Sequence, residues 1–261
     1  MEILSADIMA FIASYIWPFA RLSGMVMVMV ITSAKTTPPM IRLFYCLALT
    51  VMVAPVLPPM PDVELFSMSS FMIILQQSLI GIAVGFVTTM LIQTFVIAGQ
   101  IIAMQTSLGF ASMADPSSGQ TSPVIGQIYI ILGTLVYLSV NGHLFMIETI
   151  VKSFETLPVS SSGLVAIQYQ TIASWLSVMF AAALSMSLSA IVAMLVINFS
   201  FGVMTKAAPQ LNVFSLGFAV GMIAGLFIIF LSLGNFMFHF NAQWQRAGEL
   251  ICSLLNNACA Y

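Results

Sequence analysis

The sequence predicts an all-α protein of the integral-membrane type, built from long, partly broken helices paired as hairpins. Composition is the first reason. The chain has 261 residues, 61% of them hydrophobic and only 5% charged, with a mean hydropathy of +1.10. Soluble proteins average about 45–50% apolar and about 25% charged residues. The second reason is that the apolar residues gather in long runs, and about 20 apolar residues in a helix span a membrane.

Six such runs follow one another, and we expect a helix in each of them. The third run alone would reach about 50 Å at 1.5 Å per residue, against a hydrocarbon core of about 30 Å. Runs of unsuitable length indicate that the chain does not sit in a bilayer as a simple bundle. We expect the tail after the last run, with Arg246 and Glu249, to be amphipathic at best. The six runs cover residues 8–31, 41–56, 71–104, 128–140, 172–204 and 213–240.

The stretch 105–127 separates the third and fourth runs and cannot be one regular helix, because it holds three glycines and two prolines. Its first half is apolar, and its second half starts with an Asp-Pro turn signal. At membrane depth, irregular backbone is tolerated only inside protein or along a water-filled cavity. The stretch is therefore either a surface loop or a segment folded into the protein at a channel or gate. Its candidate residues are Leu108, Phe110, Met113, Asp115, Pro116 and Gly119.

Polar residues in or beside apolar runs are candidates for a site, because charge in a span is costly and normally faces protein or water. Arg21 is either a contact or pathway residue, or it reaches a lipid headgroup or a nearby carboxylate if Pro18 breaks the helix just before it. His143 could relay protons, but no acid lies near it before Glu148, which favours a packing role. Glu148 and Lys152, four residues apart, predict an exposed ion pair.

The third run is expected to be surrounded by protein. It carries four glutamines, whose amides need partners that lipid does not provide. Gly81 and Gly85 form a Gly-xxx-Gly pair, which allows another helix to approach closely.

The last two long runs predict an antiparallel hairpin that packs tightly with itself or with neighbours. Each carries small residues at four-residue spacing, and a turn of a few residues joins them. The small residues are Ser177, Ala181, Ser185, Ser189 and Ala193 in the first helix and Gly217, Gly221 and Gly225 in the second. The turn includes Lys206, Pro209 and Gln210.

Several function classes find no support in the sequence. It has no phosphate-binding Walker loop, no Gly-x-Ser-x-Gly and no His-Glu-x-x-His, and its three cysteines lack metal-site spacing. We therefore expect no enzyme, no cofactor and no metal site. The net charge of −2 offers no basic patch for nucleic acid. No acid lies inside an apolar run, where a proton-coupled transporter usually needs one.

Four segments together give the sequence a family resemblance. The chain resembles the FliR family of flagellar export-gate proteins, which includes the equivalent proteins of virulence type III secretion systems. The resemblance runs in order over essentially the whole chain. The segments are Ser-Leu-Gly-Phe-Ala-Ser-Met-Ala-Asp-Pro at 107–116, Asn-Gly-His-Leu at 141–144, Leu-Pro at 157–158 and Ala-Pro-Gln-Leu-Asn-Val-Phe at 208–214.

This resemblance implies a subunit of a helical hetero-oligomer in the bacterial inner membrane, at the flagellar basal body or secretion apparatus. One such subunit assembles with FliP-like and FliQ-like subunits into a gate that passes unfolded export substrates, and a FlhB-like switch protein surrounds the cytoplasmic opening. Residues 1–163 are similar to a FliP subunit, and residues 164–261 form a FliQ-like hairpin and tail. The stretch 105–127 corresponds to the plug of the channel, and the turn at Lys206, Pro209 and Gln210 to a cytoplasmic partner contact.

Two other functions stay open at the level of sequence. The first is a secondary transporter or channel for a small solute that works alone, with Arg21 and His143 as its polar site residues. The second is a structural assembly subunit without contact to a pore.

Overall fold

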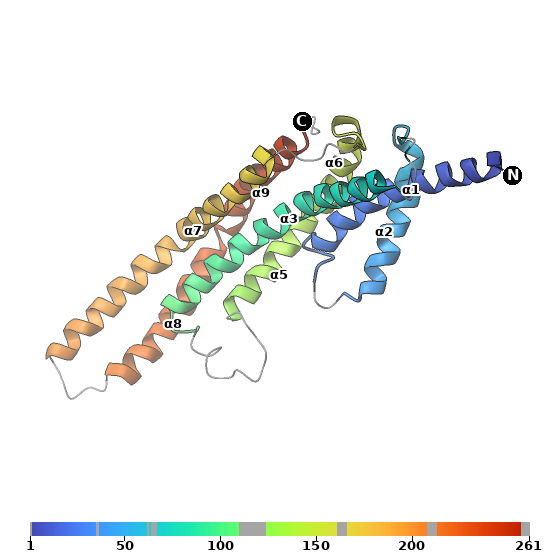
Figure 1. Ribbon diagram of the computed structural model, residues 1–261. Coiled ribbons are helices and arrows are strands. Elements are labelled where there is room, and N and C mark those ends of the chain that lie inside the picture. The colour runs from blue at the N-terminus through green and yellow to red at the C-terminus, as the bar shows by residue number, and fades with distance from the viewer. Residues whose placement is uncertain are drawn as a thin grey trace. The chain divides into compact units, whose positions relative to one another are not determined.

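A computed structural model describes residues 2–34, 37–61, 63, 67–109, 124–160, 166–207 and 213–256 (Figure 1). Every regular element in these ranges is helical, which confirms the predicted all-α class. The elements are α1 (Glu2–Val28), α2 (Pro39–Val53), the short 3₁₀ helix η1 (Ala54–Val56), α3 (Met68–Gln105), α5 (Val124–Ser139), α6 (Gly142–Thr156), α7 (Ala166–Ala207), α8 (Val213–Leu233) and α9 (Phe236–Leu254).

The ends of several helices follow from proline and glycine. Pro39 occupies the first turn of α2, where its missing N–H would have no partner anyway. The run 213–240, expected as one helix, is instead broken into α8 and α9 at Gly234 and Asn235. The helix then continues through the predicted tail, where Ala247 and Ile251 are buried and Arg246 and Glu249 are exposed.

The over-long runs are single helices. α3 has 38 residues and α7 has 42, which correspond to about 57 and 63 Å. In α3, 72% of the most apolar window is buried by the chain itself, compared with 11% in α2. The expected protein surroundings of α3 are thus confirmed for most of its length, although Gln93 is exposed. Among the described residues three helices are long and apolar enough to cross a membrane, or five if two interrupted pairs each count as one span.

The chain forms two compact units made of interleaved segments. One contains residues 1–90, 137–175 and 245–261, and the other contains residues 91–136 and 176–244. The division at residue 163, which rests on family resemblance rather than on packing, stays a prediction.

In the first unit, α1 crosses α3 at glycines on both helices. Gly24, Gly81 and Gly85 are buried, and each faces the backbone of the opposite helix. A Cβ at Gly81 would collide with the Arg21 carbonyl oxygen and lie 2.8 Å from the Met25 nitrogen. The backbones therefore touch directly, as the Gly-xxx-Gly pair predicted.

The ends of α6 and α9 and the start of α7 also lie in this unit, and side-chain hydrogen bonds join α6 and α7 to the end of α9. The Thr156 hydroxyl donates to the Leu255 carbonyl at 2.7 Å, and the Gln168 amide donates to the Leu254 carbonyl at 2.8 Å. Both bonds satisfy carbonyls at the end of α9 that have no partner within the helix. The predicted Glu148–Lys152 pair forms on the exposed face of α6, with a 2.7 Å separation.

The second unit packs the end of α3 against α5, the α7–α8 pair and the start of α9. α7 and α8 run antiparallel, as expected for a hairpin (Figure 1). Aromatic rings fill the contact with α9, where the Phe95 ring centroid lies 5.0 Å from that of Phe236 and 5.6 Å from that of Phe240. Tyr129 of α5 joins them at 5.7 Å from Phe236.

The α1–α3 crossing predicts that Gly81→Ala destabilises the protein. The added methyl group has no room beside the Arg21 carbonyl, and overpacking of this kind costs about 1–3 kcal/mol. We expect a lower midpoint of thermal unfolding for the protein purified in mild detergent.

Gly202→Ala is the matched control, because Gly202 lies in α7 with nothing within 4 Å of an added Cβ. Alanine favours a helix interior by about 1 kcal/mol over glycine, so this variant should be neutral or more stable. Equal unfolding midpoints for the Gly81 variant and the native chain would contradict a backbone-to-backbone crossing.

Candidate functional site

The stretch 105–127, which we call the gate segment, is described only at its two ends. Leu108 and Gly109 follow α3 and are partly and fully buried, respectively. Phe110, Met113, Asp115, Pro116 and Gly119 lie outside the described residues. Their role as a plug therefore stays a prediction, and the site is built here from the residues where the segment leaves α3.

The chain leaves α3 through a tightly bonded turn. The Thr106 hydroxyl donates to the Ile102 carbonyl at 2.8 Å. Ser107 adopts φ 63° in the left-handed region, which ends the helix. The Gly109 N–H then donates to the Ala103 carbonyl at 2.9 Å. These bonds fix the direction in which the segment departs.

This turn lies against the glycine-bearing face of α8. A Cβ at Gly225 would collide with the Thr106 side chain, whose Cγ2 would be only 2.7 Å away. A Cβ at Gly221 would meet the Ser107 Oγ at 3.6 Å, an ordinary contact, and one at Gly217 would meet nothing within 4 Å. Of the three candidate packing glycines, Gly225 is thus packed tightly by this chain, Gly221 is packed without strain, and Gly217 faces open space.

The two helices that flank the gate segment also touch each other through glycine. A Cβ at Gly99 of α3 would lie 3.1 Å from the Gly126 Cα and 2.9 Å from the Tyr129 ring of α5. This close backbone contact holds α3 against the start of α5. Neither Gly99 nor Thr106 was identified from the sequence, because their partners lie 27 and 119 positions further along the chain.

The serine and alanine series of α7 lies on an exposed face of the described chain. Met179, Ala183, Ala190 and Met194 form the buried face of α7 instead. The candidate packing residues Ser177, Ala181, Ser185 and Ser189 are exposed, and Ala193 is partly buried. Their packing against another helix is untested and stays a prediction.

The candidate partner contact is described at Lys206 alone. Lys206 is exposed in the last turn of α7, where a positive charge complements the helix dipole. Pro209 and Gln210 lie outside the described residues.

Arg21 is fully buried and hydrogen-bonded to three neutral groups. Its Nε donates to the Gln77 side chain at 2.7 Å, and its two terminal nitrogens donate to the Ser153 hydroxyl at 2.9 Å and the Leu157 carbonyl at 2.8 Å. The guanidinium carbon lies 4.0 Å from the centre of the Phe154 ring, so a cation–π contact adds to these bonds. Arg21 is thus a contact residue that joins α1, α3 and α6.

The structure bears on two alternatives raised for these polar residues. α1 continues through Pro18 without a break, so the idea that this proline releases Arg21 towards a headgroup is wrong. His143 is the second residue of α6 and partly buried, and its Nδ1 has no hydrogen-bond partner among the described residues. Neither residue has an acidic partner among the described residues, and the relay role of His143 stays a prediction.

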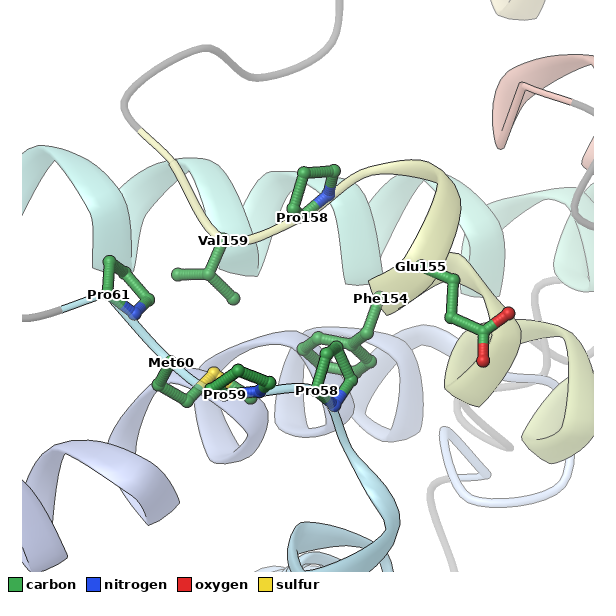
Figure 2. A pocket seen from close by; sticks show the side chains of 8 residues that line it. All are labelled: Pro58, Pro59, Met60, Pro61, Phe154, Glu155, Pro158 and Val159. Carbon is green, nitrogen blue, oxygen red and sulfur yellow. The ribbon is translucent and has the colours of Figure 1, made fainter.

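A pocket of about 270 Å³ lies beside the Arg21 cluster, on the far side of the chain segment that carries Phe154. Figure 2 shows its wall, made of segments 58–61 and 154–159. The lining is mostly proline and aliphatic, and no described group of three His, Cys, Asp or Glu could hold a metal. We assign it no ligand. It is lined by Pro58, Pro59, Met60, Pro61, Phe154, Glu155, Pro158 and Val159.

Comparison with known proteins agrees with the predicted family. Residues 12–247 match the family described as "Bacterial export proteins, family 1". The chain is 31% identical over 226 residues to the flagellar biosynthetic protein FliR of Escherichia coli, covering 87% of this chain and 86% of that protein.

Proteins of other bacteria are similar to this chain as well. The identity is 30% over 197 residues to FliR of Aquifex aeolicus, with 75% and 76% of the two chains covered. It is 26% over 208 residues to FliR of Bacillus subtilis, with 78% and 80% covered. Together with the all-helical, strongly apolar fold, these matches show that the chain belongs to the FliR family of flagellar export-apparatus proteins.

Proposed function

We propose that this chain is one subunit of the flagellar export gate and contributes to the channel through which unfolded proteins cross the inner membrane. Family membership carries this proposal. The physical support is the bonded turn that follows α3, its close contact with α8 and the membrane-type composition of the chain. The chain binds and positions, and we assign it no catalytic step.

Exposed apolar surface supports the proposed assembly with unlike subunits. α7 is apolar all round, yet only 33% of its most apolar window is buried by the chain itself. Its exposed side contains the small residues from Ser177 to Ser189, and such residues favour close helix packing. We propose that FliP-like subunits contact the segment of residues 1–163, FliQ-like subunits contact the hairpin within residues 164–261, and a FlhB-like switch protein contacts the turn around Gln210.

The gate segment would close the channel as a dry apolar plug. Hydrated ions cannot cross an apolar constriction without losing solvation that nothing replaces. Leu108, Phe110 and Met113 supply the apolar side chains, and methionine and phenylalanine can repack around a passing chain. Glycine and proline, here Gly119 and Pro116, disfavour a regular helix, and we propose that they let the segment swing aside for a passing chain.

The geometry gives less support to a transporter that works alone. A transport site needs a polar group that a solute can reach. Arg21 is fully buried, and its three hydrogen bonds go to groups of the same chain. We therefore place Arg21 in the framework of the protein and not on a solute path.

Deleting residues 110–119 should make the membrane leak small ions, because the apolar seal is lost. The complex should still assemble, since the helices that flank the segment are held together outside it, at Gly99 and Gly126. The measurement is ion conductance, or growth under salt stress, in cells that express the deletion with its partners. A surface loop without a sealing role predicts an assembled and ion-tight deletion variant.

The turn between α7 and α8 should face the cytoplasm and contact the switch protein. Cysteine at Gln210 is expected to react with a membrane-impermeant reagent added from the cytoplasmic side, and to cross-link to that partner. Cysteine at exposed Lys206, four residues earlier in the chain, should be labelled from the same side. Labelling from the periplasmic side alone would reject the assignment.

Arg21→Lys should lower the stability of the assembled protein without creating or removing solute transport. One ammonium group cannot reach the three acceptors that the planar guanidinium contacts. Each hydrogen bond to a charged group contributes about 1.5–3 kcal/mol, so we expect a fall of at least about 2 kcal/mol in the free energy of unfolding.

Arg246→Lys is the control, because Arg246 is exposed and such changes stay within about 0.5 kcal/mol. Thermal unfolding of both variants in detergent makes the comparison. If Arg21→Lys instead unfolded like the native protein and abolished uptake of a small solute, the transporter function would be favoured.

A further inference from the structure

Gly225 is the one glycine of the α8 series at which no side chain fits in the described structure. Both the Cβ and the Cγ2 of Thr106 lie too close to a Cβ at this position, with Cγ2 at 2.7 Å. Carbon atoms in ordinary contact are about 3.5–4.0 Å apart. The Thr106 side chain therefore occupies the space that a side chain at residue 225 would fill.

The Thr106 side chain is held rigidly. Thr106 is fully buried, and its hydroxyl is bonded to the Ile102 carbonyl of the preceding helical turn. The left-handed Ser107 and the Gly109–Ala103 bond fix the backbone that follows. Thr106 cannot rotate away from α8 without breaking its own hydrogen bond, so a side chain at residue 225 must displace the backbone.

The displaced backbone would be the end of α3 just before the gate segment. A Cβ placed about 1 Å too close to Thr106 requires a shift of similar size. Leu108, two residues further along, would move with it. The contact thus sets where the segment 105–127 begins relative to the hairpin helix α8.

We propose that Gly225 is a positioning residue of the export gate, whose missing side chain seats Thr106 and thereby holds the start of the gate segment in its sealing position. This inference rests on the proposed plug function of that segment. The inference gives α8 a second role besides packing against neighbouring subunits. Its contact with Thr106 fixes the position at which the gate segment starts.

The position of the turn after α3 relative to α8 can be measured by cross-linking, independently of the proposed plug function. Cysteines at Ser107 and Gly221 should form a disulfide in the purified complex under mild oxidation, because the Ser107 Oγ lies 3.6 Å from a Cβ at residue 221. Adding Gly225→Ala should lower the cross-linked fraction about tenfold, as expected for overpacking of a rigid contact. Adding Gly217→Ala, where the space is open, should leave it unchanged.

A second substitution, at Thr106, tests the same contact. Thr106→Gly removes the Cβ that blocks an alanine at residue 225, and glycine is well tolerated where a helix ends. We expect Thr106→Gly to restore the cross-link in the Gly225→Ala background. Thr106→Ala keeps the blocking Cβ and should restore much less.

The functional readout is ion leakage of the assembled complex. Gly225→Ala should raise leakage although the subunits still copurify, and Thr106→Gly should return it towards the native level. Gly202→Ala in α7, where nothing lies within 4 Å of an added Cβ, should leave it unchanged. A structural defect alone would lower the yield of complex and would not give an assembled complex that leaks and is repaired at residue 106.

The outcomes separate this inference from the plug function. An unchanged cross-link in Gly225→Ala, or a lost cross-link in a complex as ion-tight as the native one, overturns the positioning role. If the 110–119 deletion is itself ion-tight, the plug function fails and the gate role of Gly225 fails with it, whatever the cross-link shows. A leaking deletion combined with a tight, unseated Gly225→Ala variant would overturn the inference alone.

Discussion

Direct contact between helix backbones is the constraint on which this structure depends. A chain this apolar cannot rely on the hydrophobic effect to choose helix partners within a membrane, because lipid is as apolar as leucine. Glycine supplies the choice instead, since it allows backbones to approach where any side chain would collide. The contacts at Gly81 and Gly85 in one unit and at Gly99 in the other follow this principle, while Gly225 makes room for the Thr106 side chain.

The polar interactions act on the framework that these glycines create. Arg21 can bond to α3 and α6 because the α1–α3 crossing brings its backbone against Gly81. Thr106 meets α8 at a position where the facing residue has no side chain. At Arg21 buried hydrogen bonds fix geometry that apolar packing alone would leave free to slide, because such bonds are costly to break. At Thr106 the bond to the Ile102 carbonyl fixes the side chain on its own helix, and the contact with α8 is steric.

The sequence was sufficient for the fold class, the over-long helices, the Gly81–Gly85 crossing and the family, because each depends on composition, run length or short motifs. It was insufficient for the break at Gly234, since an apolar run of 28 residues looks the same whether straight or broken. It also could not identify Thr106, Gly99 or the partners of Arg21. Those contacts join residues separated by 27 to 136 positions, and no local periodicity reports them.

The bonding of Arg21 has a consequence for how the chain is made. Gln77 is 56 positions and Ser153 is 132 positions further along, so both acceptors are translated long after Arg21. At about 5–20 residues per second, synthesis of those 132 residues takes roughly 7–26 s. A guanidinium is costly to bury before its hydrogen-bond acceptors exist. Arg21 therefore reaches its buried position only after residue 153 has been made, so completing this cluster is a late step of folding.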